Sequence, residues 1–149
     1  MKQTKKFLML TCWLLILAAI LLSGVACGKD DDSRTAEEIW AEDAKYREDT
    51  SLGSGEKTFS LTVRFNSYAV TFTVKTDRET VGEALVDHAL LEGEQGAYGL
   101  YVKRVNGILA DYDVDKSYWS LQKNGEELMT GVDSTPVTDG AAYEFVYKK

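Results

Sequence analysis

Hydrophobic and polar residues alternate with a period of two in the first segments after residue 56, and this pattern predicts strands. Every second side chain is apolar from Phe59 to Phe65 and again from Val70 to Val74. Side chains of a strand point alternately to opposite faces, so each segment has one apolar face. The intervening Asn66–Ser67 is a turn signal, and together these segments predict a β-hairpin with a two-residue turn.

The spacing of apolar residues then changes to that of a helix. Thr80 and Glu83 form a Thr-x-x-Glu capping box, which predicts the start of a helix at residue 80. Apolar and aromatic positions follow at helical spacing, at Val81, Ala84, Leu85, His88 and Leu91. We expect Gly93 and Gly96 to end this helix.

Several short strands are predicted after the helix, each bounded by a turn signal. They cover Tyr98–Val105, Ser117–Lys123 and Ala141–Lys148, and the turn signals are Asn106–Gly107, Asn124–Gly125 and Asp139–Gly140. One hairpin, one helix and several further strands predict a single α+β domain over residues 57–149. We expect a small β-grasp-like fold, a curved and mostly antiparallel sheet with one packed helix.

The N-terminus has the order of a secretory signal peptide, which we assign to residues 1–26. Three lysines, Lys2, Lys5 and Lys6, precede the apolar run from Phe7 to Leu22. That run is shorter than the about 20 residues that a membrane-spanning helix needs. An uncleaved membrane anchor is the alternative.

Cys27 follows small residues, as in a bacterial lipobox, and is our candidate for lipidation. Gly24 stands where a lipobox prefers Leu, so ordinary cleavage and secretion is the alternative. Residues 27–56 are interpreted as a polar tether, with a marginal solvated helix over 35–46 and a flexible joint at 50–55. The expected location is the outer face of a bacterial cytoplasmic membrane, with the lipid on Cys27 as the membrane contact.

The charge balance excludes one class of partner. Without residues 1–26 the chain keeps 14 basic and 24 acidic residues, a net charge of −10. An acidic surface repels the phosphate backbone, so we expect no nucleic-acid partner. With Cys12 removed, Cys27 would have no partner for an intrachain disulfide.

Catalytic and metal-binding patterns are weak, and we expect no enzyme activity. Nucleophile and nucleotide-binding motifs are absent, and the single histidine, His88, lies within the apolar stripe of the predicted helix, as a core histidine would. The series Asp111, Asp113 and Asp115 has the spacing of a calcium loop. Lys116 and Gln122 replace its glycine and its bidentate glutamate, so we favour a solvated acidic loop and assign no metal site. Weak calcium binding by these aspartates is the alternative.

Aromatic residues gather in one part of the sequence: Tyr98, Tyr101, Tyr112, Tyr118 and Trp119. Because Tyr118 and Trp119 are adjacent in a predicted strand, at least one of them should face away from the core. Packing within a sheet explains such residues adequately. An exposed platform for a large ring or for a partner protein is the functional alternative.

The order of these motifs resembles the C-terminal β-domain of the cobalamin carriers transcobalamin and intrinsic factor and the bacterial lipoprotein domains grouped with them. The resemblance covers residues 57–149. It rests on Thr80–Ala89, Tyr98-Gly99-x-Tyr101, Val105–Ile108, Tyr118-Trp119-x-Leu121, Asn124-Gly125-Glu126-x-Leu128, Gly131 and Asp139–Gly140.

The resemblance implies a corrinoid-binding module that requires no cofactor and takes cobalamin as its candidate ligand. The residues it implies for binding are Tyr98, Gly99, Tyr101, Tyr118, Trp119 and Leu121. The carriers bind cobalamin between two domains, and this chain has only one of them. Either a partner, such as a transporter or a second binding domain, completes the site, or two copies of this domain do, or the domain binds something else. A protein- or glycan-binding surface module without a corrinoid site is the alternative.

Overall fold

A computed structural model describes residues 34–149, and the folded unit within it runs from Thr35 to Lys149. The predicted signal peptide and the candidate lipidation site at Cys27 lie outside the described residues. Among residues 34–149, no helix combines the length and the apolar character needed to cross a membrane.

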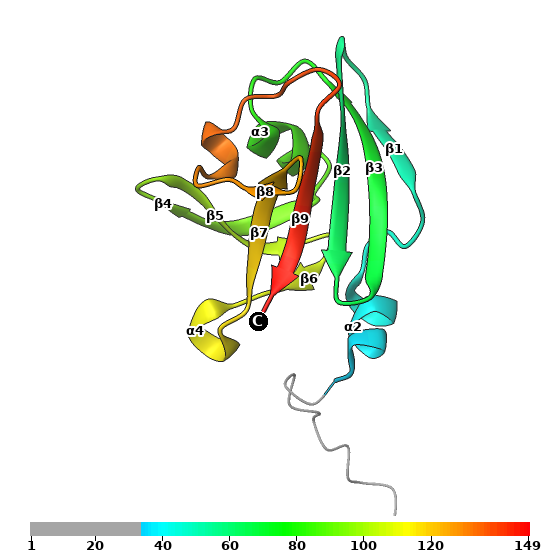
Figure 1. The fold of residues 1–149 in the computed structure, drawn as a ribbon, viewed down its shortest axis with the longest axis vertical. Coiled ribbons are helices and arrows are strands. Elements are labelled where there is room, and N and C mark those ends of the chain that lie inside the picture. The colour runs from blue at the N-terminus through cyan, green and yellow to red at the C-terminus, as the bar shows by residue number, and fades with distance from the viewer. Residues whose placement is uncertain (1–33) are drawn as a thin grey trace, which may run out of the picture. The chain divides into compact units, whose positions relative to one another are not determined.

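The larger of two sheets has six strands in the order β1-β3-β2-β9-β7-β8 (Figure 1). The predicted hairpin is confirmed as β2 and β3, which pair antiparallel along their full length. β2 also pairs parallel with the C-terminal strand β9, and β1 pairs parallel with β3. The strands are β1 (Thr50–Gly53), β2 (Lys57–Phe65), β3 (Tyr68–Thr76), β7 (Tyr118–Lys123), β8 (Glu126–Glu127) and β9 (Ala142–Lys148).

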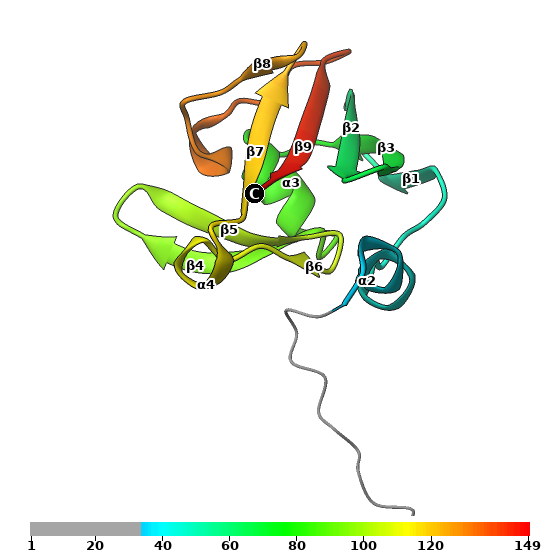
Figure 2. The same ribbon diagram turned by 60° about the horizontal axis from the view of Figure 1, so that its bottom comes forward.

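The smaller sheet has three strands and lies across one face of the larger sheet, with helix α3 (Val81–Val86) between them (Figure 2). Its strands are β4 (Leu91–Gly96), β5 (Gly99–Val105) and β6 (Ile108–Leu109). A short helix α4 (Tyr112–Asp115) and a 3-10 turn η2 (Val132–Ser134) complete the fold. The prediction of an α+β fold is confirmed.

The helix predicted from Thr80 is confirmed at its start and wrong at its end. Both hydrogen bonds of the Thr80–Glu83 capping box are present, but the helix stops at Val86. Leu91 begins β4 instead, and Gly93 lies at a bulge in the pairing of β4 with β5. A Cβ atom on Gly93 would lie 1.9 Å from the carbonyl oxygen of Tyr101, so this glycine permits close strand contact rather than ending a helix.

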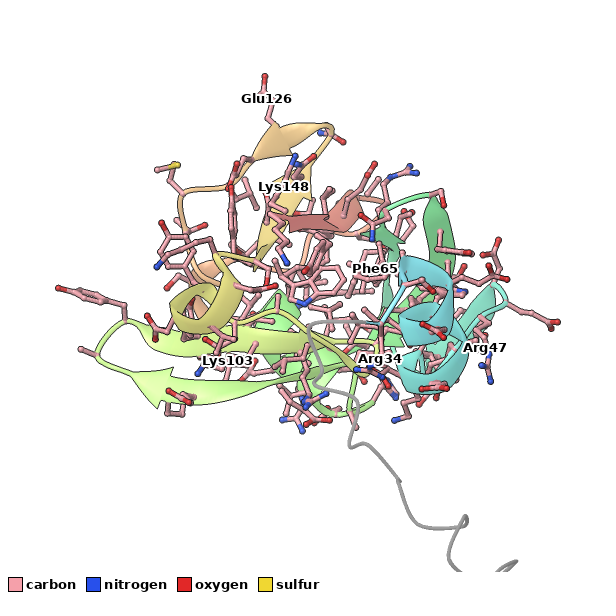
Figure 3. The ribbon with its side chains drawn as sticks, turned by 90° about the horizontal axis from the view of Figure 1, so that it is seen from below. Arg34, Arg47, Phe65, Lys103, Glu126 and Lys148 are labelled. Atoms are coloured by element: carbon pink, nitrogen blue, oxygen red, sulfur yellow. The ribbon has the colours of Figure 1, made fainter. Side chains whose placement is uncertain are left out.

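The core lies between the two sheets and is formed largely by the predicted apolar positions. The inward faces of β2 and β3 are fully buried, including Phe65, which is labelled in Figure 3. Val81, Ala84 and Leu85 bring the apolar stripe of α3 into the same cluster. The ring of Tyr143 in β9 packs edge-on against Phe59 at 5.5 Å, which joins the C-terminal strand to the hairpin.

The prediction of a flexible tether is wrong for residues 35–56. Helix α2 (Ala36–Asp43) has a complete capping box at Thr35 and packs on the core through Trp40, which is 8% exposed. The indole stacks on Tyr68 of β3 with 5.4 Å between ring centroids. The predicted joint at residues 50–55 contains β1, whose backbone pairs with β3.

A buried asparagine fixes the chain that follows α2. Asn106 is fully buried in the turn between β5 and β6. Its amide group accepts a hydrogen bond from the Tyr46 N–H at 2.9 Å and donates one to the Tyr46 carbonyl at 2.8 Å. Its backbone carbonyl accepts a third bond from Lys45. Its backbone N–H donates a fourth bond to the carbonyl of Leu90. Buried polar groups require such partners, and the three bonds to Lys45 and Tyr46 tie residues 45–46 to the smaller sheet.

Candidate ligand-binding cleft between strands β5 and β7

Two strand edges face each other where the smaller sheet crosses the larger one. One edge of β5 pairs with β4, and the opposite edge pairs with β6 only at Arg104 and Val105. On the side away from β9, β7 pairs with β8 only at Gln122 and Lys123. Within residues 34–149, no strand therefore covers the inner edges of β5 and β7 between these points.

The space between these edges is a cleft of about 200 Å³. Apolar and aromatic side chains contribute to its walls, but polar atoms make up about as much of the exposed lining as apolar ones. The strand segments that border it, residues 100–102 and 118–120, carry no charged side chain. It is lined by Leu100, Tyr101, Val102, Tyr118, Trp119, Ser120, Leu121, Glu127, Leu128, Thr130, Gly131, Val132 and Phe145. A recess with both apolar side chains and polar groups, bordered by strand edges that no further strand covers, can bind a molecule that is apolar in its middle and polar at its edge.

The structure places four of the six sequence-predicted residues in the lining of this cleft, Tyr101, Tyr118, Trp119 and Leu121, whereas Tyr98 and Gly99 line a neighbouring depression. Tyr98 at the tip of the β4–β5 hairpin is 96% exposed, and Tyr101 is 49% exposed. Tyr118 faces outward, whereas Trp119 is buried and its indole N–H donates to the carbonyl of Ile108 at 3.2 Å. The expectation that one of this adjacent pair faces away from the core is confirmed.

Of the two remaining predicted residues, Leu121 lines the cleft and Gly99 does not. Leu121 is buried in β7 and lines the floor. Gly99 begins β5 beside a second, shallower depression that contains Tyr98 and Thr130. Thr130 also lines the main cleft, so the two depressions adjoin.

Two residues near the cleft were missed by sequence reasoning. Met129 is 97% exposed and lies across the shallower depression from Tyr98. Asp133 in η2 accepts a hydrogen bond from the Leu100 N–H at 2.9 Å. Neither residue belongs to a periodic pattern or a turn motif, and both owe their position to the loop between β8 and β9.

The three aspartates of the calcium-like series serve local structure. Asp111 caps α4 and is 3.3 Å from the ammonium group of Lys103, which is labelled in Figure 3. The hydrogen bonds that the Lys103 ammonium group donates to Glu94 and to Asp111 raise the pKa of Lys103. Hydrogen bonds from Ser117 and then Lys149 lower the pKa of Asp115 to about 2. In the described part of the chain, no group of three or more His, Cys, Asp or Glu residues could hold a metal ion.

Comparison with known proteins identifies a family and one well-matched relative. Residues 79–149 match the domain of unknown function DUF4430. The crystal structure of a "putative metal binding protein" from Ruminococcus gnavus is 37% identical, with a TM-score of 0.60, over 63% of this chain and 98% of that one. None of the curated proteins matches the chain.

A more distant likeness extends to haptocorrin, whose crystal structure was determined in complex with Cbi. It is 24% identical with a TM-score of 0.49, over 66% of this chain and 26% of that chain. A likeness at this level carries no inference about the ligand.

Proposed function

The chain belongs to the same family as the Ruminococcus gnavus protein and contains a DUF4430 domain, and we propose that it is an extracytoplasmic ligand-binding module. The observation that carries the proposal is the cleft between the edges of β5 and β7 that no further strand covers, with the partly exposed Tyr101 and Tyr118 in its lining. Ligand sites are concave and largely apolar, with a few polar groups that fix orientation.

A corrinoid is our first candidate ligand. The corrin ring is broad and apolar, with amide groups at its rim, and the sequence resembles the β-domain of cobalamin carriers. The cleft of about 200 Å³ is smaller than typical ligand pockets of about 300–1,000 Å³. The ring would therefore lie across the mouth on Tyr101 and Tyr118, while its amides bond the strand edges.

A ligand held in this way remains open on its other face. We propose that a second protein, a membrane transporter or a further binding domain, covers that face. Because affinity depends on how much of the ligand is buried and how well its polar groups are paired, we expect this module alone to bind a corrinoid with a Kd of about 1–10 μM.

An amide-exchange footprint tests where the ligand binds. Residues 28–149 contain the whole described fold, and we would measure their amide exchange with and without saturating cobinamide. We expect slower exchange at residues 101–102 and 118–120, because the ligand would bond or cover the exposed edge of these segments. The N–H of Leu100 already bonds Asp133, so its exchange should change little. Protection confined to another surface, or no protection at a ligand concentration that saturates binding, would contradict this location.

Metal binding is not part of the proposal, although the Ruminococcus gnavus relative is named for it. In the described structure, the carboxylates of Asp111 and Asp115 form ion pairs with Lys103 and Lys149.

Catalysis is not part of the proposed function either. The single histidine, His88, is absent from the cleft lining, and its ring lies near Gly53 of β1. We propose that the module binds and passes on its ligand without changing it.

A protein-contact surface is the second candidate function. Tyr98 and Met129 are almost fully exposed on neighbouring loops, as apolar residues at contact surfaces often are. This candidate predicts that Tyr98→Ala weakens capture of a protein or glycan partner while corrinoid titration of the unchanged chain gives no signal.

We also propose that a lipid on Cys27 anchors the module to the outer face of a membrane. Because the folded unit begins at Thr35, the chain from Cys27 can span at most about 28 Å when fully extended. This maximum length is shorter than that of the tether predicted from the sequence, which ran from residue 27 to residue 56. Mass spectrometry of the N-terminal peptide tests the proposal, since Cys27→Ser should abolish a diacylglycerol adduct and leave the protein in the soluble fraction.

A further inference from the structure

We propose that Asp133 is a positioning residue that fixes the β4–β5 hairpin, and with it one wall of the cleft, against the rest of the domain. The expected effect of Asp133 on ligand affinity rests on the proposed function. The expected effect of Asp133 on the position of the hairpin is independent of that function.

The carboxylate of Asp133 bonds the hairpin directly. Its Oδ2 atom accepts a hydrogen bond from the N–H of Leu100 at 2.9 Å. Leu100 is the second residue of β5 and lies on the uncovered edge of that strand, two positions after the exposed Tyr98. A hydrogen bond to an ionised carboxylate is stronger than a bond between neutral groups, so this single contact can hold a strand end.

Two glycines make room for this carboxylate. A Cβ atom on Gly82, in the first turn of α3, would lie 2.3 Å from Oδ1 of Asp133. A Cβ atom on Gly99, which has a φ of +98°, would lie 2.9 Å from Oδ2. Asp133 is therefore wedged between the start of α3 and the start of β5, and a side chain at either glycine would collide with it.

The loop that carries Asp133 is itself anchored to the core. Val132 is buried, and the carbonyl of Thr135 accepts a hydrogen bond from the N–H of Val81 at 2.9 Å. The N–H of Val137 bonds the carbonyl of Glu79 at 2.8 Å. Asp133 thus connects a fixed loop to the hairpin, and no other part of the loop supplies an equivalent charged contact to β5 among the described hydrogen bonds.

Asp133 acts through Leu100 rather than on the ligand. The cleft is lined by its neighbours Gly131 and Val132, whereas Asp133 is absent from that lining and lines two neighbouring depressions, the one that contains Tyr98 and another beside the start of α3. Loss of its carboxylate should therefore loosen the wall formed by Leu100 and Tyr101 without removing a group that touches the ligand.

Amide exchange of residues 28–149 tests the positioning role without any ligand. We expect Asp133→Ala to speed exchange at Leu100 by about tenfold, as expected for the loss of a hydrogen bond to a charged group. Asp133→Asn should retain slow exchange, because its amide oxygen can accept the same bond. The matched control is Asp139→Ala, since Asp139 accepts the N–H of Thr58 at 2.7 Å away from the cleft. Unchanged exchange at Leu100 in Asp133→Ala would overturn the inference.

Titration of the same variants with cobinamide tests the consequence for binding. We expect Asp133→Ala to weaken binding by about tenfold, Asp133→Asn to restore most of it, and Asp139→Ala to leave it unchanged. Equal affinity in Asp133→Ala despite faster exchange at Leu100 would overturn the link between the wall and the ligand. If the unchanged chain binds no corrinoid, the proposed ligand fails, and the exchange measurement still decides the role of Asp133.

Discussion

Replacing Trp40 by alanine should destabilise the whole domain, because the structure makes α2 part of the core. The indole is 8% exposed and stacks on Tyr68. Burying about 200 Å² of a tryptophan at about 25 cal/mol per Å² gives an upper limit of about 5 kcal/mol. Because α2 lies at the edge of the core and can relax, we expect a loss of about 3–4 kcal/mol in the free energy of unfolding.

Urea unfolding of residues 28–149, followed by circular dichroism, measures this loss. Circular dichroism is preferable to fluorescence because the variant removes one of the two tryptophans of this segment, Trp40 and Trp119. The melting temperature should fall by roughly 12 to 16 °C. The control is Glu37→Ala, an exposed position on the same helix, which should change stability by less than about 0.5 kcal/mol.

A small effect of Trp40→Ala would refute the reasoning. If the variant lost less than about 1 kcal/mol, α2 would contribute little to the core, and the folded unit would begin nearer to residue 57. A large loss in Glu37→Ala would also count against it, since the effect would then come from helix formation rather than from packing.

Three further predictions concern stability. Asn106→Ala should lose about 2–3 kcal/mol in urea unfolding, because it removes two hydrogen bonds and leaves both half-buried backbone groups of Tyr46 without this partner. Thr80→Ala should lose about 1 kcal/mol in the same assay, since it removes the cap of α3. The pKa of Asp115 is lowered to about 2 in the folded state, so its contribution of about 1–2 kcal/mol is present above about pH 4 and lost as the pH falls toward 2. Asp115→Asn should flatten this part of the stability curve, and an unchanged acid slope in the variant would contradict the assignment.

Local rules predicted the elements whose causes lie within a few residues. The β2–β3 hairpin follows from alternation, and the start of α3 follows from the Thr80–Glu83 box. The same rules placed Leu91 on the helix, because its spacing fits a helical stripe. The bulge at Gly93 and the pairing with β5 outweigh that spacing, and neither is visible in a local window.

Features that depend on distant partners could not be predicted. Trp40 lies in a sequence that reads as a solvated helix, and it is buried because Tyr68 lies beside it in the fold. The alternation of side chains along a strand predicted that Tyr118 and Trp119 face opposite sides of the sheet. It could not predict which of the two faces outward. The role of Asp133 requires Gly82 and Leu100, which are far apart in the sequence, to meet at one carboxylate.

The central claim, that the cleft between β5 and β7 binds a corrinoid, is tested most directly by calorimetric titration of residues 28–149 with cobinamide. We expect a Kd of about 1–10 μM that weakens about tenfold in Tyr101→Ala. Tyr112→Ala is the matched control, because Tyr112 and Tyr101 are each 49% exposed and only Tyr101 lines the cleft. Binding that Tyr101→Ala and Tyr112→Ala leave equally unchanged, or no heat from a folded protein, would contradict the claim.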